Sequence, residues 1–165
     1  MGPNVRGLIP LLVQSQVHFI VIGGVAAIAH GAARTTSDVD VVYARDPENI
    51  RRLVTALQPH QPYLRGAPAG LPFRWDERTV QAGQNFTLVT TLGNLDLLGE
   101  VAGGGTYEEL LPFSREMAVF GVRCRFVTLE RLIQLKRAAG RPKDLEVIAE
   151  LQALLEERRQ LEEGP

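Results

Sequence analysis

The stretch "FIVIGGVAAIAHGAARTTSDVDVVY", residues Phe19–Tyr43, begins and ends as a buried β-strand. Its first four residues are a continuous apolar run, which predicts a strand that ends at Gly23-Gly24. The Ala-rich segment Val25–His30 predicts a short helix closed by Gly31. The last six residues, "DVDVVY", predict a second strand, yet they carry two carboxylates where an apolar segment is expected.

Asp38 and Asp40 are two residues apart in this predicted strand, so both side chains project from the same face. Val39 and Val41 then point the other way, into the core. Two adjacent carboxylates repel each other, and burying them unpaired is costly. A divalent cation such as Mg²⁺ or Mn²⁺ removes this conflict, because it binds one or two carboxylates and leaves its other positions to water and phosphate. On its own, an Asp-x-Asp pair is more often a loop cap beside a solvated sheet edge.

Three further features favour a phosphate-binding metal site over that ordinary explanation. Gly23-Gly24 lie between a strand and a helix, where a backbone without Cβ atoms can hold an anion on free N–H groups. Asp96 is another acidic residue inside a predicted apolar strand. Lys136 and Lys143 are the two lysines of a chain with sixteen arginines, and Asp144 follows them. Each feature alone also fits a tight turn, a water-facing hairpin residue or a polar helix face, but together they indicate a site.

The composition is that of an ordinary soluble protein, and 165 residues suffice for one domain with a substantial core. The formal net charge is −1, so no global field points to nucleic acid or membrane, although a local basic groove can still bind RNA. Cys124 is the one cysteine, which excludes an internal disulfide or a cysteine-based zinc site. The sequence shows no secretion signal and no apolar run of about 20 residues. We therefore expect a cytoplasmic protein without a membrane partner.

The rest of the chain predicts further helices and strands from apolar spacing, caps and turn residues. The expected helices are 5–16, 47–57 with Asp46 as N-cap, 76–82, 107–111, 129–139 between Thr128 and Gly140, and 142 to about 161. The expected strands are 85–91 and 94–101, joined at Gly93-Asn94, and 117–120 and 122–127, joined at Gly121. Residues 59–75 are rich in proline and glycine and are expected to be irregular.

This order of elements predicts an α/β (α+β) fold. We expect a mixed β-sheet with helices packed mainly on one face and helices at the C-terminus. Residues 1–165 are expected to form a single domain with a core over about residues 17–150.

The glycine pair before a short helix, the motif "TTSDVDVVY" and a later strand with a lone Asp resemble the nucleotidyltransferase superfamily with the polymerase-beta-type fold. The segments "NFTLVTTLGNLDLLGEV" and "LIQLKRAAGRPKDLEVI" are most similar to the AbiEii-like branch of that superfamily. This branch includes the nucleotidyltransferase toxins of type IV toxin–antitoxin systems. The resemblance covers residues 17–150, nearly the whole chain.

The resemblance implies one nucleotide site. Its nucleotide-binding residues would be Gly23, Gly24, Ser37, Lys136 and Asp144. Its catalytic residues would be the metal ligands Asp38, Asp40 and Asp96 together with Lys136, which would contact the triphosphate. Ser37 would replace the serine that many members have after the first glycine. Asp144 would orient either the substrate or a basic neighbour.

The implied activity is metal-dependent transfer of an NMP group from an NTP, such as ATP, to an acceptor hydroxyl or phosphate. The acceptor would be tRNA, another RNA or a protein, and the partner in a toxin–antitoxin pair would be a cognate antitoxin or toxin. Two alternatives stay open. One is a non-catalytic nucleotide-binding antitoxin or regulatory module, and the other is a small antibiotic nucleotidyltransferase.

Overall fold

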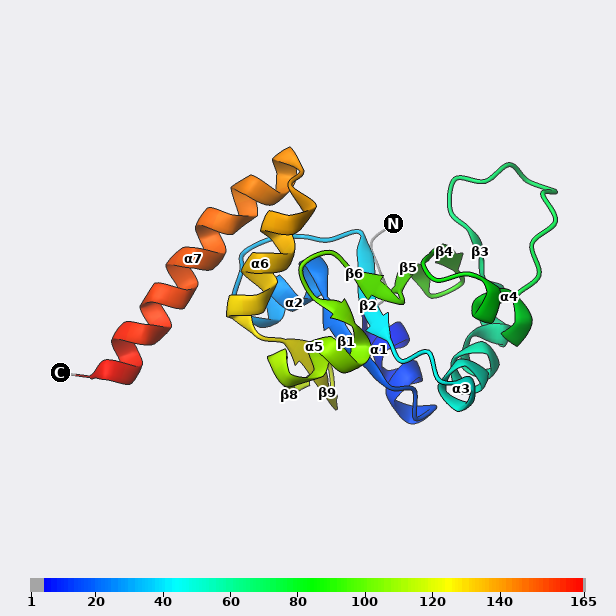
Figure 1. Cartoon of the computed structure of the whole chain (residues 1–165), viewed down its shortest axis with the longest axis horizontal. Coiled ribbons are helices and arrows are strands. Elements are labelled where there is room, and N and C mark those ends of the chain that lie inside the picture. Colours follow the sequence, from blue (N-terminus) through cyan, green and yellow to red (C-terminus); the bar gives the residue numbers. More distant parts are fainter. Residues whose placement is uncertain (1–4, 165) are drawn as a thin grey trace.

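The computed structural model describes residues 5–164, which form a seven-stranded sheet with helices around it (Figure 1). The helices are α1 (Val5–Gln14), α2 (Gly23–Ala29), α3 (Pro47–Leu57), α4 (Glu77–Ala82), α5 (Tyr107–Leu110), α6 (Leu129–Ala139) and α7 (Pro142–Glu163), with 3-10 turns at Gln58–His60 and Leu111–Phe113. The strands are β1 (Phe19–Ile22), β2 (Asp38–Tyr43), β3 (Tyr63–Leu64), β4 (Phe86–Thr90), β5 (Gly93–Leu98), β6 (Glu100–Val101), β7 (Gly105–Thr106), β8 (Ser114–Val119) and β9 (Val122–Val127).

The large sheet is mixed, with the strand order β3-β4-β5-β2-β1-β9-β8. Strand β1 is antiparallel to β2 and parallel to β9, whereas β2 is parallel to β5. The outer pairs β3–β4, β4–β5 and β8–β9 are antiparallel. Strands β6 and β7 form a separate two-stranded ribbon. The predicted α/β fold with a mixed sheet is confirmed.

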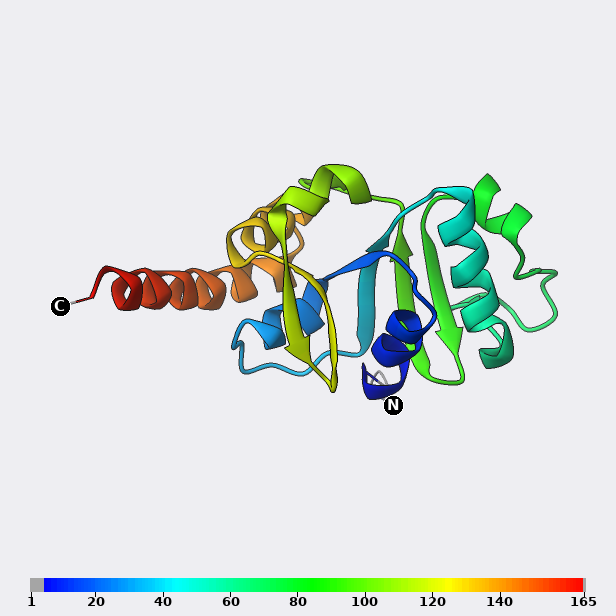
Figure 2. The ribbon, with the colours of Figure 1, turned by 90° about the horizontal axis from the view of Figure 1, so that it is seen from below.

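The core lies around the inner strands β2 and β1, and all four residues of β1 are buried. Because successive side chains of a strand point to opposite faces, the sheet is covered on both faces at its centre. Helix α2 contacts β1, β2 and α6, while α1 contacts α3. Helix α7 packs beside α6, and its C-terminal end projects from the rest of the molecule, as Figures 1 and 2 show.

Local sequence signals predict most elements correctly. Asp46 and Thr128 cap α3 and α6 through their side chains, and Gly140 ends α6 in the left-handed conformation with a φ of 66°. These signals work because caps and stops depend on residues within one helical turn of the boundary.

Some boundaries differ from expectation, and the two short strands β3 and β7 were not expected. Helix α2 begins at Gly23 rather than Val25, α1 ends at Gln14, and α7 extends to Glu163. The turn between β4 and β5 lies at Thr91-Leu92, because the Thr90 hydroxyl accepts from the Leu92 N–H and donates to the Gly93 carbonyl.

The irregular region between α3 and α4 also contains β3, which pairs with β4. A strand of two residues is too short to show a period-two pattern in sequence. Its position at the sheet edge nevertheless brings the next residue, Arg65, close to the strands that carry the aspartates.

Candidate active site

The three acidic residues on strands lie together on one face of the sheet. The parallel register of β2 and β5 places Asp40 directly beside Asp96, and Asp38 lies two residues earlier on the same face. One carboxylate oxygen from each of the three lies within 4.8 Å of the other two. Each of these side chains is half-buried, whereas Val39 and Val41 between them are completely buried. The core therefore anchors the backbone that presents the carboxylates, which we call the acidic triad.

The glycine pair leaves room for this triad. Strand pairing places Ile22 beside Asp40, so that Gly23 follows directly at the carboxylate. Gly23 has a φ of 69°, and a Cβ atom there would overlap Asp40 Oδ2. A Cβ atom on Gly24 would lie 2.6 Å from the Thr36 hydroxyl oxygen. A side chain at either position would thus displace the triad or the loop before it.

The triad opens into a cleft of about 650 Å³, a size typical of small-molecule sites. The triad, the glycine pair and the exposed Ser37 line one part of this cleft. The α6–α7 junction lines another part with Lys136, Arg141, Lys143 and Asp144. All eight residues expected to form the site therefore line the same cleft, although they lie up to 121 positions apart in sequence.

Asp144 contacts the basic residues of this junction. Its side chain is 1% exposed and accepts hydrogen bonds from Arg141 Nε at 2.7 Å and from the Arg141 backbone N–H at 3.1 Å. Lys136 Nζ lies 3.5 Å from Asp144 Oδ1. Burial alone would raise the pKa of Asp144, but the Arg141 hydrogen bonds and the Lys136 charge hold it below its ordinary value. Of the two roles expected for Asp144, the geometry shows contact with basic neighbours.

Asp40 has a raised pKa. Its pKa is raised to about 7, most strongly by burial and further by the hydrogen bond with Asp96 and the charges of Asp96 and Asp38. The nearby Lys136 ammonium opposes this shift. The fold therefore holds carboxylates closer together than their charges favour, which is an arrangement typical of functional sites.

Sequence reasoning missed Arg65, which contacts two members of the triad. Its terminal nitrogens lie 2.6 Å from Asp96 Oδ1 and 3.4 Å from Asp38 Oδ1. Little in the sequence indicates that Arg65 belongs to the site, because it lies in a loop-like segment with no regular spacing to either aspartate. Only the pairing of β3 with β4 brings it to the site.

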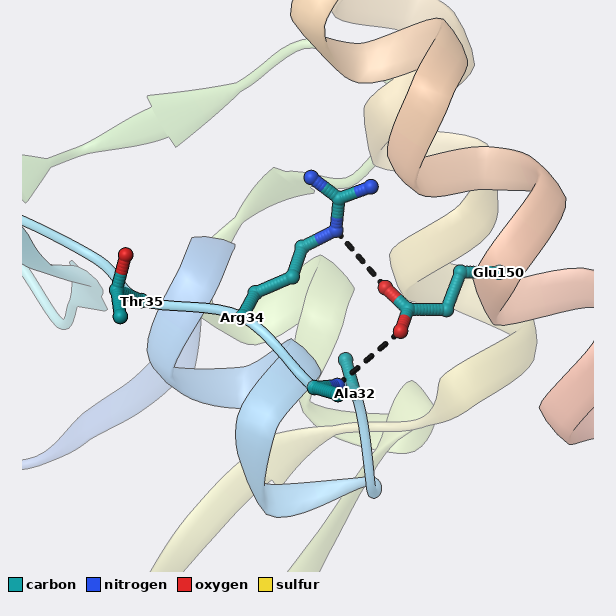
Figure 3. A pocket seen from close by; sticks show the side chains of 5 residues that line it. Ala32, Arg34, Thr35 and Glu150 are labelled. Carbon is teal, nitrogen blue, oxygen red and sulfur yellow. Dashed lines mark hydrogen bonds and ion pairs between the residues drawn. The ribbon is translucent and has the colours of Figure 1, made fainter.

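Helix α7 also holds the loop that leads into the triad, as the close view in Figure 3 shows. Arg34 Nε donates to Glu150 Oε1 at 2.8 Å, and the Ala33 N–H donates to Glu150 Oε2 at 3.1 Å. Arg34 lines the same cleft as the triad. Glu150 thus connects the position of α7 to the loop before Asp38.

The donor set suits a hard divalent cation. It consists of oxygen ligands on rigid strands, their mutual repulsion is relieved by positive charge, and the adjoining cleft has space for water and phosphate. Asp38, Asp40 and Asp96 are the residues that would hold such an ion. Exposed acidic clusters also occur without metal, but here burial and the raised pKa of Asp40 make the unneutralised state unfavourable.

A protein-family model described as "Nucleotidyltransferase of unknown function (DUF6036)" matches residues 8–98, more than half of the chain, including the triad. The chain belongs to this nucleotidyltransferase family. No curated protein sequence matches this nucleotidyltransferase significantly.

Solved structures share the fold of this nucleotidyltransferase at low sequence identity. A lincosamide antibiotic adenylyltransferase with bound lincomycin has a TM-score of 0.59 at 14% identity, over 92% of this chain and 96% of that one. A candidate nucleotidyltransferase from Thermotoga maritima has a TM-score of 0.56 at 15% identity, over 90% of each chain. An antigenic nucleotidyltransferase-like protein from Paracoccidioides brasiliensis has a TM-score of 0.57 at 17% identity, over 91% of this chain and 74% of that one.

Within residues 5–164 of this nucleotidyltransferase, no helix combines the length and apolar character that a membrane span requires.

Proposed function

We propose that this nucleotidyltransferase moves an NMP group from an NTP to an acceptor hydroxyl or phosphate, with release of pyrophosphate and with Mg²⁺ or Mn²⁺ at the acidic triad. The observation that carries the proposal is the convergence of three strand carboxylates on a cleft that Lys136 also lines. Nucleotidyl transfer requires positioning of the α-phosphate and neutralisation of charge on the attacking and leaving oxygens. This cleft places anionic metal ligands next to cationic and backbone donors, which is the combination that such a reaction needs.

The roles of the side chains follow from their positions. Asp38 and Asp40 would hold the metal that accompanies the NTP, while Asp96 on the adjacent strand would complete the metal site and accept the proton of the acceptor. When bound, divalent cations would neutralise the phosphates and lower the pKa of the attacking hydroxyl. Lys136 would contact the triphosphate, positioned by its pair with the buried Asp144.

The phosphate side of the site would use the backbone. Gly23 and Gly24 begin α2, and within the described chain no side chain caps this start. Their N–H groups, together with the exposed hydroxyl of Ser37, would bind phosphate oxygens.

The more specific hypotheses about function differ in the class of acceptor. Similarity of the motifs to the AbiEii-like branch favours RNA, above all tRNA, or a protein as acceptor, in a toxin–antitoxin pair with a cognate partner. A lincosamide adenylyltransferase has a similar structure over nearly the whole length of both chains, which supports a small hydroxylated antibiotic as the second candidate acceptor. A non-catalytic nucleotide-binding module would keep the cleft but transfer nothing.

A label-transfer assay tests these possibilities together. The purified chain is incubated with each α-labelled NTP and Mg²⁺ or Mn²⁺, and with total tRNA, a protein extract or a set of hydroxylated antibiotics as acceptors. Transfer to one acceptor class identifies the substrate, and Asp40→Asn should abolish it. Glu156→Gln, at an exposed position on α7, is the matched control and should retain it. Tight NTP binding without transfer to any acceptor would refute the enzymatic proposal in favour of a binding module.

A further inference from the structure

Arg65 lies in a row of residues that crosses the sheet to the triad. Its backbone N–H donates to the Thr87 carbonyl at 2.9 Å, and Thr87 pairs with Asp96, which in turn pairs with Asp40. Neighbours in such a row point to the same face of the sheet. Because Thr87 is small and exposed, the long Arg65 side chain can reach across it to the carboxylates.

The guanidinium bridges two carboxylates rather than pairing with one. One terminal nitrogen donates to Asp96 Oδ1 at 2.6 Å, and the other lies 3.4 Å from Asp38 Oδ1. That second nitrogen also donates to the Leu88 carbonyl at 3.3 Å. All three charged side chains are about one-quarter exposed, so water screens this contact only partly. Arg65 thus supplies positive charge where a divalent cation would supply it.

Arg65 can leave this position without unpacking the core. Its own side chain is 26% exposed, and the neighbouring Thr87 and Val89 on β4 are exposed. The residues after it, from Gly66 to the start of α4, form a long connection without helix or strand. Rotation of the side chain toward solvent would break two ion pairs and one hydrogen bond.

We infer that Arg65 is a positioning residue that acts as an internal counter-cation and competes with the divalent cation for the triad. This inference depends on the proposed metal-dependent function. Without metal, Arg65 neutralises Asp38 and Asp96 and keeps the triad assembled. When a divalent cation binds, Arg65 releases at least one of the two carboxylates. Metal alone therefore binds weakly, and the phosphates of an NTP supply the ligands that shift the competition toward the metal.

The test is Mn²⁺ binding to the full chain without nucleotide, measured by electron paramagnetic resonance of free Mn²⁺ at pH 8. Arg65→Gln should tighten Mn²⁺ binding by about tenfold. The ion must break a charged hydrogen-bonded pair in the wild type, and such a pair is worth about a tenfold change in affinity. Arg65→Lys keeps the charge but lacks the fork that spans two carboxylates, so it should also tighten binding, to a smaller extent. Arg34→Gln removes a charge from the same cleft, but Arg34 pairs with Glu150, and affinity should change less than about twofold.

A second readout separates competition from a structural role. In EDTA, Arg65→Gln should lower the melting temperature, and saturating Mn²⁺ should raise it more than in the wild type. Unchanged or weaker Mn²⁺ binding in Arg65→Gln overturns the inference. Wild-type Mn²⁺ affinity in Arg65→Lys also overturns it, because any positive charge at this position would then act equally well and the bridge between two carboxylates would not matter. If Arg65→Gln does not fold, the Arg65→Lys result decides. If neither the wild type nor any Arg65 variant binds Mn²⁺, the proposed metal-dependent function fails as well.

Discussion

Asp40→Asn should make the metal-free protein more stable at alkaline pH while it abolishes metal-dependent transfer. Asp40 is mostly buried beside Asp96 and Asp38, and these surroundings raise the pKa of its carboxyl to about 7. Asn has the same shape as a protonated Asp and can also donate a hydrogen bond to Asp96. The substitution thus removes the unfavourable charge and keeps the packing.

The magnitude follows from the pKa difference between the folded and unfolded chain. The ordinary value for Asp is 3.8 and the folded value is about 7, so about three pH units separate them. Each unit corresponds to about 1.4 kcal/mol. Because the folded pKa lies above the unfolded one, the wild type loses stability as the pH rises from 3.8 to about 7 and little more above that. Asp40→Asn should therefore exceed the wild type by about 4 kcal/mol at pH 8 and by only about 2 kcal/mol at pH 5.

The assay is urea unfolding in EDTA at both pH values, with Glu156→Gln as a control for loss of an exposed carboxylate. The control should differ from the wild type by less than about 0.5 kcal/mol at either pH. Saturating Mn²⁺ should stabilise the wild type more than Asp40→Asn. An Asp40→Asn protein that is no more stable than the wild type at pH 8 in EDTA would refute the reasoning that crowded carboxylates are costly here.

Three substitutions and one metal-removal experiment test other parts of the site. Gly23→Ala should cost about 2 kcal/mol of stability in urea unfolding and abolish Mn²⁺ binding, because its Cβ overlaps the Asp40 carboxylate in a left-handed conformation. Lys136→Arg should weaken NTP affinity by about tenfold in a calorimetric titration, since a broad fork replaces a compact charge. Asp144→Asn should destabilise the fold by about 2–3 kcal/mol in urea unfolding, because the Lys136 charge loses its buried partner. Chelation with EDTA should stop label transfer, and added Mg²⁺ or Mn²⁺ should restore it.

Each substitution has a matched control in the chain. Gly121 has a φ of 76° but open space around its Cβ position, so Gly121→Ala should be strained without affecting Mn²⁺ binding. Lys143→Arg changes the other lysine of the cleft, which is exposed, and should alter NTP affinity less than Lys136→Arg. Glu146→Gln removes an exposed carboxylate from the same turn as Asp144 and should leave stability nearly unchanged. Equal effects in a variant and its control would contradict the assigned contact.

The sequence by itself determined the features that depend on neighbours along the chain. The period of two in a strand places Asp38 and Asp40 on one face, whatever the rest of the fold. Helix caps and stops at Asp46, Thr128 and Gly140 are equally local, because one turn of backbone contains both the signal and its effect. The glycine pair signals close approach, but the sequence does not name the Asp40 carboxylate as the group that needs the space.

Only the tertiary structure decided which distant residues lie beside each other in the site. The parallel register of β2 and β5 places Asp96 next to Asp40, and strand pairing between distant segments leaves no local pattern. The two-residue strand β3 brings Arg65 to the triad, and Asp144, which lines the cleft, is buried against Lys136 and Arg141. Such contacts arise when segments far apart in the chain pack together, so their geometry appears only once the whole sheet has formed.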